Sequence, residues 1–226
     1  MAETILPYSS LIDVPVVENN EPLVVTQETT PEVVWRYEKQ DMVTALQSEK
    51  MYLRSGALGR LRDAAAWLDR HLPGARLRVV HAYRLPSIQE EYFSARLAKF
   101  RAQHPEMTDL EIRELSHTLS ASPDVAGHPT GGAVDLIIAT DRGNLDMGTA
   151  IADFRDENLE RIKTFCTDLT DAQRTNRALL RSIMMHAGFA PYNGEWWHFS
   201  YGDREWAAYY RLPNATYGPI DLLRTP

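Results

Sequence analysis

Two short stretches constrain this chain more than any other part of it. They are GHPTGGAVD at 127–135 and GEWWHF at 194–199. Together they carry His128, Asp135 and His198, the nitrogen and oxygen donors of a catalytic zinc site with three protein ligands and one open position. Glu195 is not one of the three ligands, and a carboxylate beside a metal-bound water acts as a general base. The sequence therefore predicts one Zn²⁺ per chain on these three ligands, with Glu195 as the base.

The backbone between the first histidine and the aspartate has to bend. His128 and Asp135 are seven residues apart, and a flat strand would point them to opposite faces. Gly131 and Gly132 lie between them and permit a bend or a bulge. The apolar run 133–138 that follows predicts a buried strand, so Asp135 is a carboxylate that needs a buried partner such as a metal ion.

Other segments have clear periodicity. Apolar residues recur at helical spacing over 56–71, and residues 76–83 alternate as a strand does, with Val79, His81 and Tyr83 on one face and Arg84 at the end. Residues 196–201 are aromatic and predict another strand. Three capping boxes predict helix starts. These are Ser87 with Glu90, Thr108 with Glu111, and Thr170 with Gln173 for a helix that ends near Ala187.

The same residues resemble a known family. With Tyr83-Arg84 upstream, the spacing of His128, Asp135, Glu195 and His198 is similar to that of the zinc D-alanyl-D-alanine dipeptidases of peptidase family M15, within the broader group of D,D-peptidases and hedgehog-like domains. The resemblance covers about Leu53 to Tyr210. Further segments that resemble the family, in the same order, are 145–149, 176–184, 187–189 and 197–203.

The resemblance implies both a fold and a reaction. The fold is α+β, with a small, mainly antiparallel sheet that carries the metal ligands and helices packed on one side. The reaction is hydrolysis of the small dipeptide D-Ala-D-Ala by a metal-activated water, with Glu195 as base and Arg84 polarising the scissile carbonyl. Tyr83 and Asp153 are candidate substrate-binding residues. The donor set also leaves Fe²⁺, Co²⁺ and Mn²⁺ open.

The chain departs from the family at three places that bear on the substrate. His81 stands where the family has an acidic residue; it competes as a third metal ligand, but packing in the core is the favoured interpretation. Ala126 replaces a serine two residues before the first histidine. Ala152 replaces an aspartate that lies near the substrate's amino group, and Asp153 follows one residue later. Arg84 and Asp153 also have simpler interpretations, as a strand-end cation and a solvated loop acid.

These departures leave two alternatives open. The first is a D,D-carboxypeptidase or endopeptidase on peptidoglycan stem peptides, or a dipeptidase of another specificity. The second is a hedgehog-like zinc module that binds partners without hydrolysis. A structural zinc is disfavoured because such sites are usually four-coordinate and rich in cysteine, whereas this chain has only Cys166.

Length, composition and charge bear on the domain organisation, the partners and the location of the protein. At 226 residues the chain is expected to form a single catalytic domain, with an extended arm over 1–45 packed on it and an extended tail over 212–226. The net charge of −7 argues against nucleic acid and anionic membranes as partners. The N-terminus has no signal-peptide pattern, and no apolar run reaches membrane-spanning length. We expect a cytoplasmic protein and leave a homodimer open.

Overall fold

Two sheets organise the chain in its computed structural model, which describes residues 4–224. The termini of the expected arm (1–3) and tail (225–226) lie outside the described residues. The strands are β1 Leu23–Val25, β2 Val34–Trp35, β3 Tyr52–Arg54, β4 Arg76–His81, β5 Ala133–Thr140, β6 Gly143–Asn144, β7 Ala190–Pro191 and β8 His198–Ser200. The main sheet has the order β2-β4-β5-β8-β7, with β6 paired to β5, and β1 pairs with β3 separately. Only the pair β2–β4 is parallel among these described strands.

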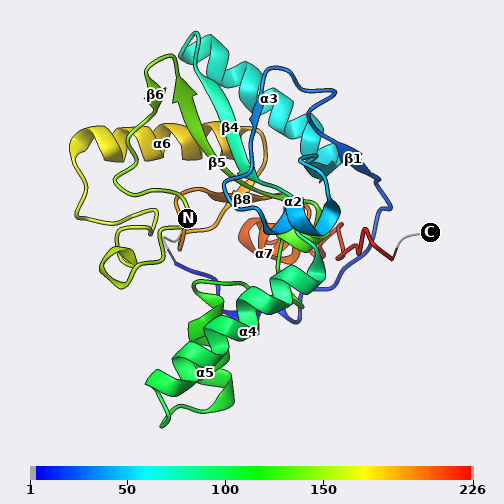
Figure 1. Cartoon of the computed structure of the whole chain (residues 1–226), viewed down its shortest axis with the longest axis vertical. Coiled ribbons are helices and arrows are strands. Elements are labelled where there is room, and N and C mark those ends of the chain that lie inside the picture. The colour runs from blue at the N-terminus through cyan, green and yellow to red at the C-terminus, as the bar shows by residue number, and fades with distance from the viewer. Residues whose placement is uncertain (1–3, 225–226) are drawn as a thin grey trace.

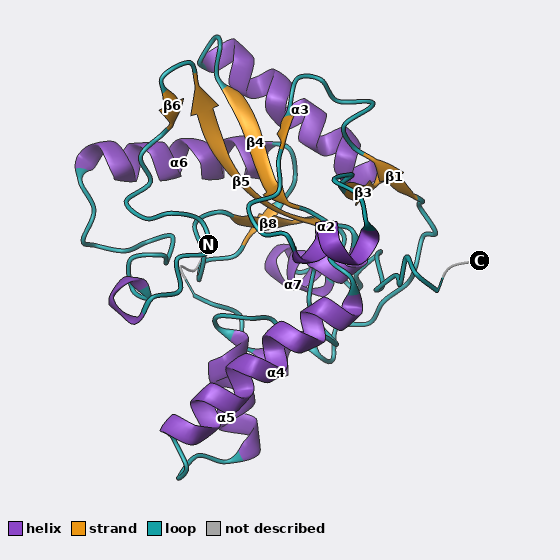
Figure 2. Ribbon diagram, in the orientation of Figure 1, coloured by secondary structure: helices purple, strands orange, loops and turns teal. Residues whose placement is uncertain are grey.

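Helices surround this sheet (Figures 1 and 2). They are α1 Tyr8–Leu11, α2 Asp41–Leu46, α3 Ser55–His71, α4 Pro86–Gln103, α5 Asp109–His117, α6 Asp171–His186 and α7 Arg204–Tyr210, with short 3₁₀ turns η1 His128–Thr130 and η2 Asp156–Asn158. Helices α3 and α6 pack on each other and on the sheet, whereas α4 and α5 form a pair that projects at the lower end of Figure 1. The architecture is α+β, as predicted.

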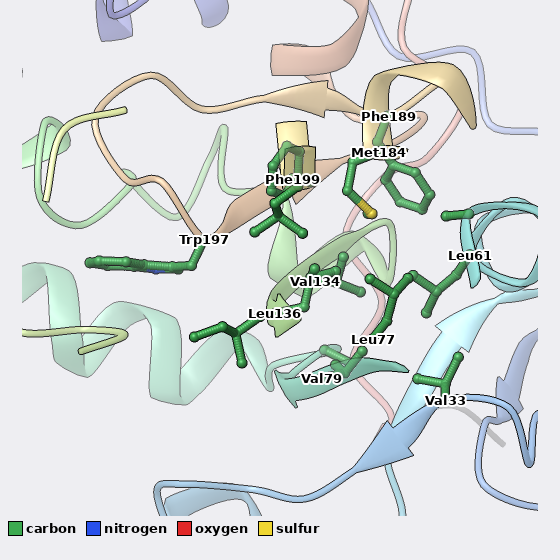
Figure 3. Close-up of a cluster of buried hydrophobic side chains, with 14 of the residues drawn as sticks. Val33, Leu61, Leu77, Val79, Val134, Leu136, Met184, Phe189, Trp197 and Phe199 are labelled. Carbon is green, nitrogen blue, oxygen red and sulfur yellow. The ribbon is translucent and has the colours of Figure 1, made fainter. Parts of the chain in front are cut away.

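The core lies between the sheet and the α3–α6 pair. Val134, Leu136 and Ile138 of β5 are fully buried, and their spacing of two places them on one face of the strand. Figure 3 shows Val134 and Leu136 in one cluster with Leu61 of α3 and Met184 of α6. Because strand residues alternate between faces, Asp135 points away from this core. The apolar run thus holds a carboxylate on the opposite face of a buried strand.

A β-bulge in β4 changes the face of the sheet on which the following side chain lies. Val79 pairs with Leu136, but the next pair is His81 with Asp135, so Val80 is the extra residue. Cross-strand partners share a face, and the bulge therefore turns His81 away from the core and toward Asp135. The sequence placed His81 on the same face as Val79, which this register contradicts.

The two glycines before β5 make the predicted bend. Gly131 ends η1 in the left-handed region, with φ of 76°. The Gly132 carbonyl accepts a hydrogen bond from the Tyr201 amide at 3.0 Å. A Cβ added at Gly132 would lie 2.1 Å from the Tyr201 carbonyl oxygen, so only glycine fits between η1 and the loop after β8.

Gly132→Ala is therefore expected to destabilise the protein. The new methyl group meets backbone, which cannot rotate away, and overpacking of this kind costs about 1–3 kcal/mol or more. In a chain of this size each kcal/mol lowers Tm by about 2–4 °C, which thermal denaturation can measure. Gly59→Ala in α3 is the matched control, since a Cβ there meets nothing within 4 Å. A Gly132→Ala protein as stable as the wild type would contradict this packing.

The arm and the tail lie against the same part of the domain. The expected arm is not extended throughout. Residues 4–45 contain the strands β1 and β2, the helix α1 and all of α2 except its last residue, Leu46. The buried guanidinium of Arg54 joins the two ends, because it binds Glu18 at 2.9 Å and the Gly218 carbonyl at 3.1 Å. Within 4–224, no helix combines the length and the apolar composition that crossing a bilayer requires.

Two of the three predicted capping boxes are confirmed. Thr108 with Glu111 begins α5, and Thr170 with Gln173 begins α6. The prediction for Ser87 and Glu90 was wrong, because α4 already begins at Pro86 and the Glu90 carboxylate instead accepts a hydrogen bond from the Ser94 hydroxyl at 2.9 Å. Proline needs no N–H partner in the first helical position, so the start moves upstream.

Candidate active site

Three strands bring three polar side chains into one row. Asp135 of β5 is the register partner of His81 on β4 and of His198 on β8. Since cross-strand partners share a face, all three lie on the side of the sheet opposite the core. His128 joins them from η1, the turn that Gly131 ends.

The side chains of His128, Asp135 and His198 can hold a metal ion. One donor atom from each lies within 4.8 Å of the other two. The His128 Nε2 is 3.3 Å from one Asp135 oxygen, and the His198 Nδ1 is 3.0 Å from the other. The His128 Nδ1 lies 2.7 Å from the Ala82 carbonyl, which makes it the donor there and leaves Nε2 free as a ligand.

The charges in this group favour a cation. Burial opposes ionisation of Asp135, but His128 and His198 hold its pKa well below the usual range. Burial likewise opposes protonation of His198, yet its hydrogen bond to Asp135 and the nearby carboxylates raise its pKa to about 9. The pKa of His128 falls to about 4 because the ring is buried. The aspartate thus stays ionised and His128 neutral, the states in which both bind metal, whereas His198 has to release its proton to a competing metal ion.

Glu195 stands next to this group without a hydrogen-bond partner for its carboxylate among residues 4–224. Its carbonyl accepts a hydrogen bond from the His198 amide at 3.3 Å, so a turn connects the two residues. The side chain lines the same cavity as the three candidate ligands. Burial raises its pKa to about 7, the effect of Asp135 adds to this, and His198, Arg84 and Lys39 oppose it. A carboxylate with a pKa near neutrality suits proton transfer.

Arg84 lines the cavity and is held by two neutral acceptors. Its Nε donates to His81 Nε2 at 3.1 Å, and its Nη1 donates to the Gln89 amide oxygen at 2.7 Å. Gln89 is buried and donates in turn to the Ala121 carbonyl. His81 is outside the group of mutually close donor atoms found in the described part of the chain, so its geometry supports a role in orienting Arg84 rather than ligation.

A cavity of about 600 Å³ contains the whole arrangement. Its floor is the row of Asp135 and the histidines, and α4 supplies part of one wall. The charged side chains that line it are Glu38, Lys39, Arg84, Arg96, Lys99, Asp135, Glu195 and Glu205. Sequence analysis did not single out Gln89 or Glu205. Gln89 lies one helical turn after the start of α4, and Glu205 resembles an ordinary first-turn acid of α7.

Both predicted substrate-binding residues are placed elsewhere. Tyr83 is fully buried, and its hydroxyl donates to the Ile220 carbonyl at 2.7 Å, which ties down the C-terminal segment. Asp153 is held by Arg155 and Asn158 at 2.7 Å each. Neither residue lines the cavity. The structure therefore does not support substrate binding by Tyr83 or Asp153, whereas it brings the other five predicted residues together.

A protein-family profile and two sequence relatives that match this chain share one description. A protein-family profile described as D-ala-D-ala dipeptidase, Peptidase_M15, matches residues 29–215. A D-alanyl-D-alanine dipeptidase of Synechocystis sp. is 31% identical over 195 residues, which is 75% of this chain and 79% of the relative. A D-alanyl-D-alanine dipeptidase of Enterococcus faecium is 35% identical over 91 residues, covering 39% of this chain and 43% of the relative.

The likeness to solved structures is more distant. VanYB in complex with D-alanine-D-alanine is 17% identical, with a TM-score of 0.43, and the match covers 73% of this chain and 81% of that one. The LD-carboxypeptidase LdcB is 18% identical, with a TM-score of 0.45, covering 87% and 76%. A VanY D,D-pentapeptidase mutant with Zn(II) is 18% identical, with a TM-score of 0.41, covering 85% and 87%.

Proposed function

This chain belongs to the Peptidase_M15 family of D-Ala-D-Ala dipeptidases, and from that membership we propose that it is a zinc metallopeptidase that hydrolyses the dipeptide D-Ala-D-Ala. The single observation that carries the proposal is the grouping of a carboxylate and a guanidinium, Glu195 and Arg84, around three clustered metal donors in one cavity. A structural metal site needs neither group. A hydrolytic site needs both a base and a stabiliser of negative charge.

The proposed ligands of Zn²⁺ are His128, Asp135 and His198. Two imidazoles and a carboxylate match the donor types of catalytic zinc sites with an open position. Zinc in such a site acidifies a coordinated water and polarises a carbonyl oxygen. The hydrogen bond from His128 Nδ1 to the Ala82 carbonyl fixes the orientation of the ring, which supports the assignment of His128 Nε2 as a zinc ligand.

The protein's own groups then divide the remaining work. Glu195 accepts a proton from the attacking water and passes it to the leaving amine, as a general base and then a general acid. Arg84 donates to the carbonyl oxygen of the substrate as negative charge develops there. The neutral partners His81 and Gln89 orient the guanidinium without cancelling its charge, because neither is an anion.

Substrate turnover tests the proposal directly. Zinc-loaded protein is expected to release free D-alanine from D-Ala-D-Ala and to leave L-Ala-L-Ala intact. The second candidate is a D,D-carboxypeptidase, favoured by the cavity volume of about 600 Å³, which falls in the range that holds drug-sized ligands. A pentapeptide that ends in D-Ala-D-Ala distinguishes the two. Faster cleavage of the pentapeptide than of the dipeptide would favour the carboxypeptidase, and cleavage of neither would contradict both.

Gln89→Leu is expected to reduce activity through Arg84. Leucine removes the oxygen that accepts from the Arg84 Nη1 at 2.7 Å, so the guanidinium loses one of its two orienting contacts. We expect kcat/KM for D-Ala-D-Ala to fall about 10–100-fold, the range for such supporting residues, while bound zinc stays at the wild-type level. Gln103→Leu, an exposed change on the same helix, is the control. Unchanged kcat/KM in Gln89→Leu would contradict this role.

We also propose that the protein acts on a free dipeptide in the cytoplasm. The single cysteine, Cys166, fits a reducing compartment, and the net charge of −7 fits a small peptide substrate better than a polyanion. Fractionation of the producing cells tests the location. Sedimentation of the purified protein tests whether it forms a homodimer.

A further inference from the structure

Glu205 carries an acidic group into the cavity that nothing in the reaction described above uses. It is half-buried, it lines the cavity, and no hydrogen bond or ion pair reaches its carboxyl group from residues 4–224. Burial raises its pKa to about 8; His198 opposes this shift, and Asp203 and Glu195 add to it. A cation that a ligand brings close to such a carboxyl group stabilises its ionised form, because an opposite charge lowers the pKa of an acid.

Helix α7 fixes the position of Glu205. The Asp203 carboxylate caps this helix by accepting a hydrogen bond from the Trp206 amide at 2.8 Å. The Trp206 indole donates to the Gly188 carbonyl at 3.0 Å, and the Tyr210 hydroxyl donates to the Phe189 carbonyl at 2.9 Å. Residues on both sides of Glu205 are thus anchored, so its side chain projects from a rigid element, which suits precise recognition.

Cations line the same cavity as Glu205. Lys39, Arg84 and Arg96 each interact electrostatically with Glu195. A dipeptide is a zwitterion with an ammonium group at one end and a carboxylate at the other. Its ammonium end is attracted to an unpaired carboxylate such as Glu205, and its carboxylate end to the cations that line the cavity.

We propose that Glu205 binds the free amino group of the dipeptide and so favours substrates with a free N-terminus. The inference rests on the proposed function. It also accounts for Asp153, whose carboxylate is bound by Arg155 and Asn158 outside the cavity and is not available for this task. The carboxylate that binds the amino group thus comes from α7 and not from the loop after Gly148.

The test compares two substrates in two proteins. Zinc-loaded wild type and Glu205→Gln are assayed with D-Ala-D-Ala and with N-acetyl-D-Ala-D-Ala, which lacks the ammonium group. Glutamine keeps the shape of the side chain and removes its charge. We expect kcat/KM for the free dipeptide to fall about 10–100-fold in the variant, the range for a hydrogen bond to a charged group, and kcat/KM for the acetylated substrate to stay unchanged.

Glu91→Gln is the matched control, since this exposed glutamate lies on α4 and does not line the cavity. It should leave both substrates unaffected. An equal loss on both substrates in Glu205→Gln would overturn the proposal, because it would indicate a role in the chemistry or in stability. An unchanged kcat/KM for the free dipeptide in Glu205→Gln would overturn it as well.

A binding measurement separates this inference from the proposed function. If the wild type cleaves neither substrate, the proposed function fails, and calorimetry with D-alaninamide and N-acetyl-D-alaninamide then decides the role of Glu205 without turnover. Tighter binding of the free amine by the wild type, lost in Glu205→Gln, would support the assignment. Equal binding of the two amides by the wild type would reject it.

Discussion

Glu195→Gln is expected to lower kcat for D-Ala-D-Ala by about 10²–10⁴-fold, the usual contribution of a general base. Glutamine occupies the same volume beside His198 but cannot accept the proton of the attacking water. The backbone turn that joins residues 195 and 198 uses the Glu195 carbonyl, so it survives the substitution. Zinc content, measured on the same samples, is expected to equal that of the wild type because Glu195 is not a proposed ligand.

The pH profile gives a second measurement on the same residue. Burial, with Asp135, raises the pKa of Glu195 to about 7, whereas bound zinc, a cation, lowers it again. A base acts when it is deprotonated, so kcat/KM of the wild type should rise with pH through a limb at or below about 7. That limb should be absent from the residual activity of Glu195→Gln. A glutamine variant with wild-type turnover would remove Glu195 from the mechanism.

The sequence predicts the centre of this site well because the physical requirements there are local. Two glycines between His128 and Asp135 indicate a bend, and an aspartate inside an apolar run indicates a buried carboxylate in need of a partner. The capping boxes at Thr108 and Thr170 are likewise local, and both helices begin there. The α+β class follows from such segments together with the family resemblance.

The side chains around the centre were harder to predict because they depend on register. A bulge at Val80 moves His81 to the face of Asp135, and alternation alone assigns it to the core. Gln89 meets Arg84 only because α4 begins at Pro86, three residues before it. A single residue of shift in either element would separate these partners, and periodicity does not fix elements to that precision.

Substrate recognition was the least predictable part. Asp153 is close in sequence to the position expected to bind the amino group, yet Arg155 two residues later captures its carboxylate. Glu205 is distant in sequence from any motif that suggests amine binding, and only the packing of α7 against the sheet brings it to the cavity. The proposed substrate recognition therefore depends on a local ion pair at Asp153 and on the packing of a distant helix, whereas the metal donors follow from the sheet.

Asp135→Asn is expected to abolish zinc-dependent activity. The aspartate bridges both histidines, at 3.3 Å from His128 and 3.0 Å from His198, and it is the only anion among the three proposed ligands. Asparagine keeps the shape but removes the charge that attracts the cation and sustains the pKa of His198. We expect zinc affinity to fall by more than the about 10–100-fold typical of residues that only support a ligand.

Thermal denaturation with and without zinc measures this loss independently of turnover. A metal that binds only the folded state raises Tm, and the rise grows with its concentration relative to Kd. The wild type should therefore show a zinc-dependent rise that is much reduced in Asp135→Asn. Asp153→Asn is the matched control, because its carboxylate lies outside the cavity and binds Arg155 instead. If both variants kept the full zinc response, the zinc would have to be held by donors other than Asp135, and the row formed by β4, β5 and β8 would lose its assigned role.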